Sequence, residues 1–328
     1  MTGKRVLVLA DLPGQGVERL AELCDVEVRP QGVESEDELA ELVPGVHGLL
    51  TLLMHRVGEK ALSAADSLEA VANCAVGVDN IDLEAARRHD VVVTNTPGVL
   101  TEDTADLTWA LILSVLRGVV SGDRFLRRGD FRGWRPQLLL GRSLQSVVLG
   151  VVGAGRIGQA VLHRAAAFGV RTLYASRSRL PVEREKALGT EWRELAALLA
   201  ESDVVSLHLP LNEETRHLMD RRRLAAMKPG SVLVNTARGP LVDEAALAAA
   251  LAAGHLAGAG LDVYEHEPRV DPDLLLMENV VLLPHLGSAT RETRIRMADC
   301  CCEDLITVLV EGQRPQRDLA CNLSHPRP

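Results

Sequence analysis

The chain has 328 residues, of which 47% are hydrophobic and 25% charged, and its formal net charge is −9. This length suggests two domains with ample apolar core, and the acidic balance argues against a general binder of nucleic acid or anionic membranes. Aromatic residues make up only 2% of the chain, so the core must consist of Leu, Val, Ile and Ala.

No segment of the sequence approaches the roughly 20 apolar residues of a membrane span. The first residues pass directly into a predicted strand, without the apolar run of a signal peptide. The six cysteines form no C-x-x-C pair and have no His partner at zinc spacing. We therefore expect a cytoplasmic protein with reduced cysteines, no metal site, and no membrane or nucleic-acid partner.

Short apolar strands alternate with helical segments over the first hundred residues. Strands are predicted at residues 4–10, 26–28, 48–53, 68–73 and from 91 to the Pro-Gly turn at 97–98. Helices are predicted at residues 16–23, 36–42 and 59–63, the second with Ser35 as N-cap and Glu38 completing a capping box. This alternation is typical of βαβ units and a parallel sheet.

A long helix is predicted at residues 101–117, beginning at the N-cap Thr101. Its apolar positions cover more than one face, which is typical of a helix buried between layers or against another subunit. The following segment, from Arg124 to Leu144, lacks clear periodicity, and we expect an extended arm there.

The motif Gly153-Ala-Gly155-Arg-Ile-Gly158 lies between a predicted strand at 147–152 and a predicted helix at 157–168. This is the context in which a G-x-G-x-x-G motif binds a dinucleotide. The first glycine allows a tight turn, the second lets the backbone approach a pyrophosphate, and the third lets the helix pack closely on the strand. The helix N-terminus supplies amide donors. A glycine-rich turn without a ligand is the alternative.

The alternation continues to the end of the chain. Further strands are predicted at residues 171–175, 203–207, 231–235, 257–263 and 279–283, and further helices at about 191–200, 244–253 and 291–311. This pattern indicates an α/β protein with two doubly wound parallel-sheet domains, one flavodoxin-like and one of the Rossmann type. We expect the last helix to return to the first domain. The domains are then residues 1–100 with 291–328, for substrate, and an inserted dinucleotide-binding domain at 101–290.

Three ionisable residues, Arg238, Glu267 and His285, each follow a predicted strand. The carboxyl ends of parallel strands open on the crevice where the dinucleotide is expected, so these side chains should meet there. An Arg binds a carboxylate or polarises a carbonyl, and a His donates a proton to a carbonyl that receives hydride. We expect Glu267 to orient the imidazole and hold it protonated. The combination suggests hydride transfer to a small 2-oxo acid.

The residues that follow the strand at 171–175 indicate which dinucleotide is preferred, NADH or NADPH. An NAD-dependent enzyme places an acidic residue about 20 residues past the glycines. This chain instead has Ser176, Arg177, Ser178 and Arg179, which suit the 2′-phosphate of NADPH. The sequence therefore predicts a preference for NADPH, with NADH possible and a solvated Arg pair as the alternative.

Several longer motifs strengthen this interpretation. They are Ala75-Val-Gly-Val-Asp-Asn-Ile-Asp82, Thr94-Asn-Thr-Pro-Gly-Val-Leu-Thr101, Asn235-Thr-Ala-Arg-Gly-Pro-Leu-Val-Asp243, Gly260-Leu-Asp-Val-Tyr-Glu-His-Glu-Pro268 and Pro284-His-Leu-Gly-Ser-Ala-Thr290. Through these motifs the whole chain resembles the D-isomer-specific 2-hydroxyacid dehydrogenases. Within that family it most closely resembles the glyoxylate/hydroxypyruvate reductases, through the motif at 75–82, Gly122-Asp-Arg-Phe125, Trp134-Arg-Pro136 and the end of the strand at 171–175.

The resemblance implies that Arg238, Glu267 and His285 are catalytic, and that a homodimer forms through the helix at 101–117 and the arm around Trp134. It implies substrate binding by Leu53, Val76, Gly77, Arg238 and His285. Beyond the three glycines and residues 176–179, it implies cofactor contacts from Thr104, Arg156, Ile157, Pro210, Thr215, Thr236, Ala237 and Asp262.

The resemblance has departures, such as Leu144-Gln-Ser where many relatives have Gly-Lys-Thr, and Leu138 where some have an aromatic residue. The alternatives are another D-2-hydroxy acid, phosphite, or a dinucleotide-sensing regulator on the same fold. Phosphite dehydrogenases share Phe131-Arg-Gly-Trp134 but have a Lys where this chain has Val76. The physiological 2-oxo acid, the direction of the reaction and the reach of the arm into a partner's active site stay open.

Overall fold

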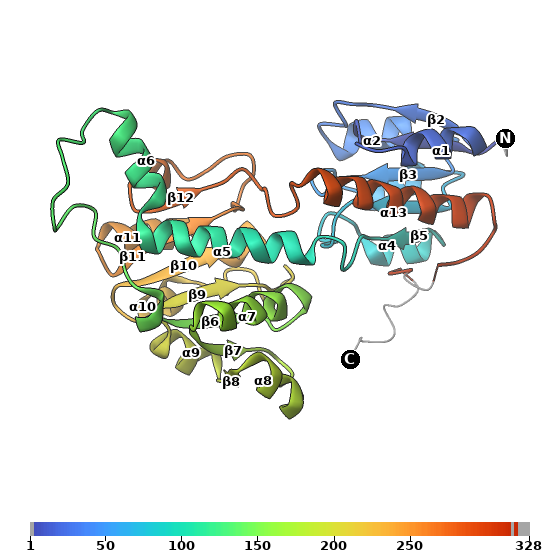
Figure 1. Cartoon of the computed structure of the whole chain (residues 1–328). Helices are drawn as coiled ribbons and strands as arrows, with labels where there is room; N and C mark the ends of the chain where they lie inside the picture. The colour runs from blue at the N-terminus through green and yellow to red at the C-terminus, as the bar shows by residue number, and fades with distance from the viewer. Residues whose placement is uncertain (1–2, 316–317, 321–328) are drawn as a thin grey trace. The chain divides into compact units, whose positions relative to one another are not determined.

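The computed structural model describes residues 3–315 and 318–320, so the end of the expected first domain, residues 321–328 with Cys321, lies outside the described residues. The chain divides into two compact units (Figure 1). The first unit comprises Met1–Leu100 and Ala289–Pro328, and the second comprises Thr101–Ser288.

The first unit contains a five-stranded parallel sheet. Its strands are β1 (Arg5–Val8), β2 (Asp25–Val28), β3 (Gly48–Thr51), β4 (Ala70–Asn73) and β5 (Val92–Thr94). Their order is β2-β1-β3-β4-β5, which is the flavodoxin-like order. The predicted fold class is confirmed for this unit.

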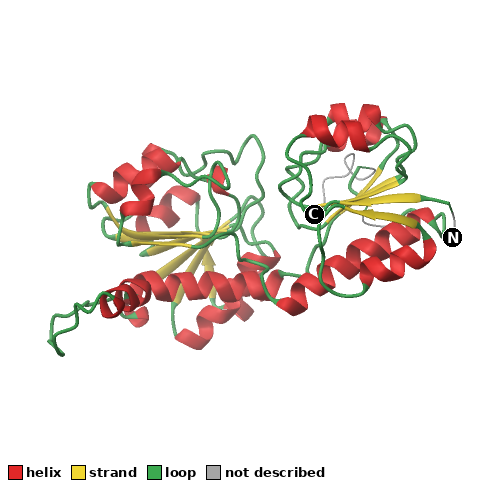
Figure 2. Cartoon of the chain, turned by 90° about the horizontal axis from the view of Figure 1, so that it is seen from above, coloured by secondary structure: helices red, strands yellow, loops and turns green. Residues whose placement is uncertain are grey.

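Helices cover both faces of this sheet (Figure 2). They are α1 (Gly16–Leu23), α2 (Glu36–Leu42), α3 (Glu59–Ala64), α4 (Leu83–Arg88) and α13 (Arg291–Leu309). Side chains of β1 alternate between the faces, since Val6 and Val8 pack with α1 and α13 while Leu7 packs with α2, α3 and α4. In α13, Met297, Cys301, Leu305 and Leu309 are spaced by four residues and form its buried stripe.

The second unit contains a seven-stranded parallel sheet. Its strands are β6 (Val148–Val152), β7 (Arg171–Ala175), β8 (Thr190–Trp192), β9 (Val204–Leu207), β10 (Ser231–Asn235), β11 (Leu256–Leu261) and β12 (Val280–Leu282). Their order is β12-β11-β10-β9-β6-β7-β8. Counted from β6, this is the Rossmann order 3-2-1-4-5-6 with a seventh strand added. The strand order reverses between β6 and β9, where such folds bind dinucleotides.

Eight helices are described in this unit. They are α5 (Thr101–Arg117), α6 (Val119–Arg127), α7 (Arg156–Phe168), α8 (Val182–Leu188), α9 (Leu195–Glu201), α10 (Arg221–Ala226), α11 (Glu244–Ala252) and α12 (Pro272–Leu276), with 3₁₀ turns at Leu144–Ser146 and Gly239–Leu241. Helix α5 is largely buried, as its apolar pattern predicted. Its Trp109 stacks on Phe168 of α7 with ring centroids 4.5 Å apart.

The structure corrects two predictions. The arm predicted at 124–144 begins later, because α6 continues to Arg127, whose guanidinium pairs with Asp123 one turn earlier. This helix buries no side chain, although its few apolar residues gather on one face. The helix predicted at 191–200 is the edge strand β8 followed by α9. The partner of β8 is β7, about 18 residues earlier in the chain, and such pairing overrides local propensity.

Four short helices, α4, α8, α10 and α12, were not predicted. Three of them begin at an aspartate whose carboxylate accepts an amide of the first turn: Asp82, Asp220 and Asp271. Within the described residues no single helix is long and apolar enough to cross a membrane. Helices α5 and α6, bent by 62° at their junction, meet the length and composition criteria only as a pair.

Candidate active site

The glycine turn after β6 has the geometry expected of its three glycines. Gly153 adopts φ +100°, and a Cβ there would lie 2.4 Å from the carbonyl oxygen of His208 at the end of β9. A Cβ on Gly158 would lie 2.0 Å from the carbonyl oxygen of Gly153, so only glycine allows α7 to start this close to β6. A Cβ on Gly155 would have no neighbouring atom within 4 Å, so the backbone there is open to a ligand.

The N-terminus of α7 completes this turn. The helix starts at Arg156 and runs for 13 residues, and its N-cap, Gly155, has no side chain to bond the first-turn amides. Those amides have no partner within the helix. Open backbone and uncapped amides beside the point where the strand order reverses fit the pyrophosphate of a dinucleotide.

The four residues after β7, Ser176 to Arg179, make different contacts. Arg179 donates two hydrogen bonds to Glu185 of α8, at 2.8 and 2.9 Å, and Tyr174 donates to the same carboxylate at 2.7 Å. Arg179 and Tyr174 together lower the pKa of Glu185 to about 2. Ser176 donates to the Ser178 carbonyl at 2.6 Å. Arg177 is exposed, and across residues 3–315 and 318–320 it forms no ion pair.

The other predicted cofactor residues of this unit lie in two groups. In the loop after β9, the Thr215 hydroxyl donates to the Pro210 carbonyl at 2.8 Å. The buried Thr108 hydroxyl links the backbone carbonyl of Thr104 to the hydroxyl of Thr236. Thr108 Oγ1 is 2.9 Å from Thr236 Oγ1 and donates to the Thr104 carbonyl at 2.8 Å. Ala237 donates its amide to the Asn235 side chain at 3.0 Å.

Asn235 and Gly239 shape the loop that carries Arg238. The Asn235 amide donates to the Arg238 carbonyl at 2.9 Å, while its oxygen accepts the Ala237 amide. A Cβ on Gly239 would lie only 1.8 Å from the carbonyl carbon and oxygen of Tyr264. The absence of a side chain at residue 239 therefore lets the Arg238 loop lie directly against the segment that leads to Glu267.

Glu267 and His285 form the central pair of the site. Nδ1 of His285 lies 2.9 Å from Oε2 of Glu267, and the other carboxylate oxygen accepts the Tyr264 amide at 3.0 Å. Burial alone would raise the pKa of Glu267. The hydrogen bond and charge of His285, the Tyr264 amide and the charge of Arg238 outweigh it, and the pKa is lowered. Glu267 is thus a carboxylate, which can only accept, so Nδ1 of His285 carries the proton between them.

The backbone of the His285 loop is anchored by Asp262. His285 has φ +56°, an uncommon conformation for a residue with a side chain. Its amide donates to the Asp262 carbonyl at 2.9 Å. The Asp262 carboxylate is fully buried and accepts the amides of Leu286 and Gly287 at 2.6 and 2.8 Å. Burial raises the pKa of Asp262 despite these donors. Thr104 completes the anchor by donating to the Gly287 carbonyl at 2.9 Å.

The predicted substrate residues of the first unit follow two neighbouring strands. Leu53 lies in the loop after β3, and Val76 and Gly77 lie in the loop after β4. Sequence reasoning missed Asn235, Tyr264 and a group of buried asparagines around Val76. A signal existed for the asparagines, because Asn73 ends an otherwise apolar strand.

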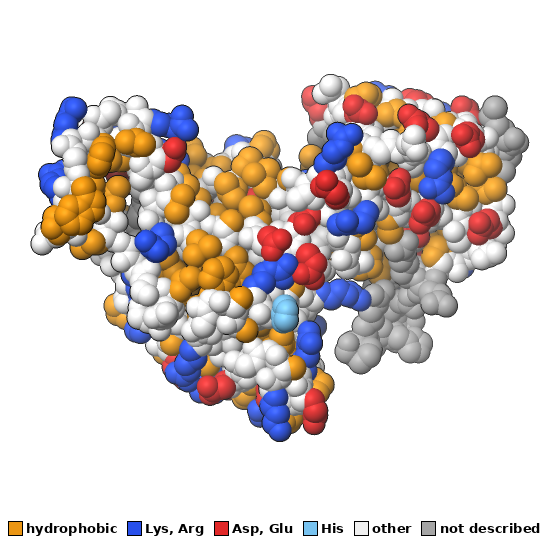
Figure 3. Space-filling model, viewed as in Figure 1, with side chains coloured by type: hydrophobic (Ala, Val, Ile, Leu, Met, Phe, Trp, Pro, Cys, Tyr) orange, Lys and Arg blue, Asp and Glu red, His pale blue; other side chains and the backbone are white. Residues whose placement is uncertain are grey.

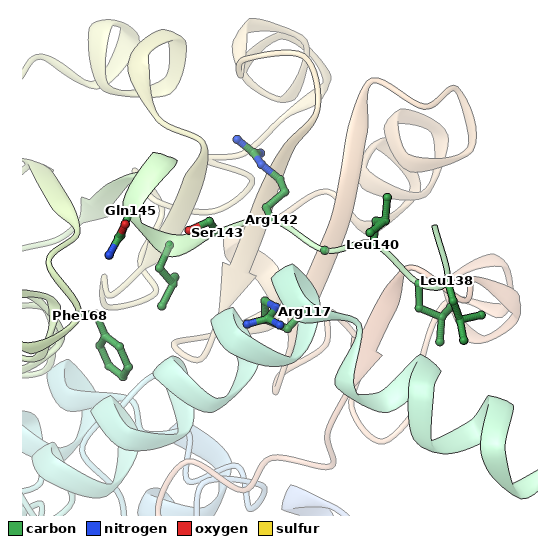
Figure 4. A pocket seen from close by; sticks show the side chains of 10 residues that line it. Arg117, Leu138, Leu140, Arg142, Ser143, Gln145 and Phe168 are labelled. Carbon is green, nitrogen blue, oxygen red and sulfur yellow. The ribbon is translucent and has the colours of Figure 1, made fainter. Parts of the chain in front are cut away.

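Two further features lie apart from these residues. A pocket of about 700 Å³ lies where α5 ends (Figure 4), and it contains none of the candidate site residues. It is lined by Arg117, Leu138, Leu139, Leu140, Gly141, Arg142, Ser143, Leu144, Gln145 and Phe168. In the described part of the chain, no group of three or more His, Cys, Asp or Glu side chains is placed to hold a metal ion.

Together, the Rossmann strand order, the open glycine turn and the Glu267–His285 pair define a nicotinamide-dinucleotide-dependent oxidoreductase. Comparisons with known proteins identify its family. The sequence profile of the D-isomer specific 2-hydroxyacid dehydrogenase NAD binding domain matches residues 109–287. The chain belongs to the D-isomer-specific 2-hydroxyacid dehydrogenases, as its motifs predicted.

The relatives include enzymes named for one substrate. The chain is 43% identical over 321 residues to the glyoxylate reductase of Thermococcus litoralis, covering 95% of each chain. It is 47% identical over 307 residues to that of Thermococcus kodakarensis, covering 92% of each. The structure of an NADPH-dependent glyoxylate/hydroxypyruvate reductase from Sinorhizobium meliloti with NADP and malonate matches with a TM-score of 0.86. That match has 35% identity and covers 97% of both chains. The chain is a 2-oxo acid reductase that uses a nicotinamide dinucleotide.

Proposed function

We propose that the chain is an NADPH-preferring reductase of glyoxylate or hydroxypyruvate, forming glycolate or D-glycerate. The observation that carries this proposal is the Glu267–His285 pair at 2.9 Å, placed beside Arg238 in a dinucleotide-binding unit. The names of the Thermococcus relatives support the substrate. In this proposal the first unit is the substrate-binding domain and the second the dinucleotide-binding domain.

His285 acts as the general acid. Its Nδ1–H is held by the ionised Glu267, which stabilises the imidazolium and leaves Nε2 to face the substrate carbonyl. When bound, the nicotinamide cofactor would supply the hydride that reduces the carbonyl carbon. The carbonyl π electrons move to oxygen, and the Nε2 proton completes the hydroxyl. Arg238 stabilises the developing charge on that oxygen, and the amides of Val76 and Gly77 bind the substrate carboxylate.

Arg177 and Ser176 carry the proposed preference for NADPH. No acid occurs among residues 176–179 to repel a 2′-phosphate or bind a ribose hydroxyl. Arg177 is exposed, whereas Arg179 is already held by Glu185. We therefore assign the 2′-phosphate contact chiefly to Arg177, with Arg179 holding the loop against α8.

A homodimer through α5 and the arm is the second part of this proposal. Hydrophobic side chains gather on the surface over α6 and the arm (Figure 3). The exposed ones include Val119, Leu126, Phe131, Trp134, Leu139 and Leu140, with Trp134 80% exposed. A cluster of this kind is typical of an interface. Light scattering on the purified protein tests it, and a monomer at micromolar concentration would contradict it. The expectation of a cytoplasmic enzyme rests on the cysteines, and the five that are described form no disulfide with one another.

Steady-state kinetics test the function. We expect NADPH oxidation with glyoxylate and hydroxypyruvate, a higher kcat/KM with NADPH than with NADH, and loss of turnover in His285→Ala. Faster turnover of a larger 2-oxo acid or of phosphite would replace the substrate assignment. Dinucleotide binding without turnover of any 2-oxo acid would favour a sensing regulator.

A further inference from the structure

Three consecutive carbonyl groups in the loop after β4 are all hydrogen-bonded to residues at the ends of β4 and β5. The carbonyl oxygens of residues 75–77 each accept one hydrogen bond. The donors are the Thr96 amide at 2.9 Å, Asn95 Nδ2 at 2.7 Å and Asn73 Nδ2 at 2.9 Å, in that order. Each carbonyl of this short segment therefore has a partner, although the segment belongs to no helix or strand.

This arrangement decides where the amides of the same segment point. A peptide unit is planar and trans, so its N–H is directed opposite to its carbonyl. Holding the carbonyls of residues 75–77 therefore directs the N–H groups of Val76, Gly77 and Val78 away from the donors at Thr96, Asn95 and Asn73. Among the residues that the structure describes, no protein group accepts these three N–H groups. Successive amides directed to one side form a concave site for an anion.

A second set of contacts ties the loop after β3 to the same group. Asn80 Nδ2 donates to the carbonyls of Leu52 and His55, both at 3.1 Å, on either side of Leu53. The side-chain amides of Asn80 and Asn73 are paired, at 3.2 and 3.3 Å. Asn73, Asn80 and Asn95, here called the asparagine network, are all buried. The Asn73–Asn80 pair rigidifies its surroundings, because breaking hydrogen bonds between buried polar groups in a low-dielectric interior is costly. Asn95 is held through Nδ2 alone, since its buried Oδ1 has no hydrogen-bond partner among the described residues.

We propose that the asparagine network positions the amides that bind the substrate carboxylate. This inference rests on the proposed function, in which the carboxylate of the 2-oxo acid binds at Val76 and Gly77. Asn95 and Asn73 act through these amides and do not touch the substrate, so they are positioning residues. Their contribution is to fix the amides before the substrate arrives, which removes an ordering cost from binding. Asn80 extends the same order to the loop of Leu53.

The variants Asn95→Ala and Asn73→Ala in the full chain test this proposal. Each should raise the KM for glyoxylate about tenfold and leave kcat within about threefold, because binding lost equally in ground and transition states changes KM alone. Inhibition by oxalate, a dicarboxylate with no reducible carbonyl, should weaken by the same factor. The Kd for NADPH should stay at the wild-type value. Asn279→Ala is the control, since Asn279 is exposed and donates to the Ala257 carbonyl in the second unit.

The outcomes separate this inference from the proposed function. If the wild-type chain reduces no 2-oxo acid, the proposed function fails. The Kd of oxalate, measured by calorimetry for wild type and variants, still tests the asparagine network, because oxalate binding requires no turnover. Unchanged KM and oxalate affinity in the folded variants would overturn the inference. So would a parallel loss of NADPH affinity and thermal stability, since that indicates a merely structural role. Should one variant fail to fold, Asn95→Leu, which has a similar size and removes the donor to Val76 without adding a charge, gives the same comparison.

Discussion

Replacing Gly239 with alanine tests whether close backbone packing sets the geometry of the proposed catalytic residues. A Cβ at this position would lie 1.8 Å from two atoms of the Tyr264 carbonyl. Carbon atoms that are not bonded rest at about 3.5 Å or more, so one of the two loops must move by roughly 1.7 Å. One loop carries Arg238 and the other leads to Glu267, and the substitution therefore changes the distance between those two side chains.

The expected effect on activity is larger than the effect on stability. A displacement of about 1 Å at reacting groups can reduce the rate by about 100-fold, and overpacking typically destabilises a fold by about 1–3 kcal/mol. We expect Gly239→Ala to lower kcat at least 100-fold, with a modest fall in Tm and retained NADPH binding at the glycine turn. Steady-state kinetics, thermal unfolding and NADPH fluorescence measure these three quantities.

A matched control is available in α6. Gly122 is helical, and only Leu139 approaches a Cβ there, at 3.9 Å. Gly122→Ala should leave kcat unchanged and stabilise the helix by about 0.5–1 kcal/mol. A Gly239→Ala variant that kept kcat within threefold of wild type would refute the link between this packing and catalysis. Unfolding of the second unit by Gly239→Ala would refute it as well, because packing would then serve the fold as a whole.

The remaining predictions concern charge and pH. Arg177→Ala should lower kcat/KM for NADPH about tenfold and leave the value for NADH unchanged, since one charge-assisted contact is worth about 1.5–3 kcal/mol in full and less at an exposed site. Arg179→Ala, which removes the partner of Glu185, should change the NADPH to NADH ratio less than threefold; a larger change would reassign the 2′-phosphate to Arg179. The folded pKa of Glu267 is lowered from 4.5, so its contribution to stability is present above that pH and is lost as pH falls through the lower folded value. Urea unfolding of wild type and Glu267→Gln should therefore show a stability gap at pH 7 that closes below pH 4.5, and a gap independent of pH would contradict the ionised pair. Asp262→Asn keeps the size of a fully buried side chain but replaces one acceptor of the Leu286 and Gly287 amides with a donor. We expect this variant to lower kcat at least tenfold and to lower Tm. Wild-type values of both kcat and Tm would exclude the anchoring role of Asp262.

Local sequence was sufficient to predict elements whose signals lie within a few residues. The apolar run before Gly153, the glycines themselves and the helix after them are all read from one stretch of chain, and the structure has the expected strand, turn and helix. Helix α5 has the predicted bounds because its N-terminal Thr101 and its apolar pattern are also local. Arg238, Glu267 and His285 each follow a predicted strand. Because parallel strands end at one edge of the sheet, the sequence predicted that these three side chains lie in one site.

Other features depend on residues that are distant in the chain. The edge strand β8 (Thr190–Trp192) pairs with β7, and the pairing outweighs the start of the helix predicted at about 191–200, whereas α9 (Leu195–Glu201) is helical as expected. A partner only six residues away can also redirect a side chain: Arg179 is predicted as a phosphate ligand by its position, yet its guanidinium is bonded to Glu185 in the folded protein. Asp262 is predicted as a cofactor contact, and the structure shows both of its oxygens bonded to the loop of His285.

The amino-acid sequence by itself determined the fold class, the glycine turn and the residue types of the proposed catalytic group. These depend on periodicity and backbone conformation, which neighbouring residues impose on one another. The tertiary structure alone decided which donor meets which acceptor. Gly239 meets Tyr264 and Asn95 meets the Val76 carbonyl only because parallel strands far apart in the chain end side by side. No short window of sequence contains both partners of such a contact.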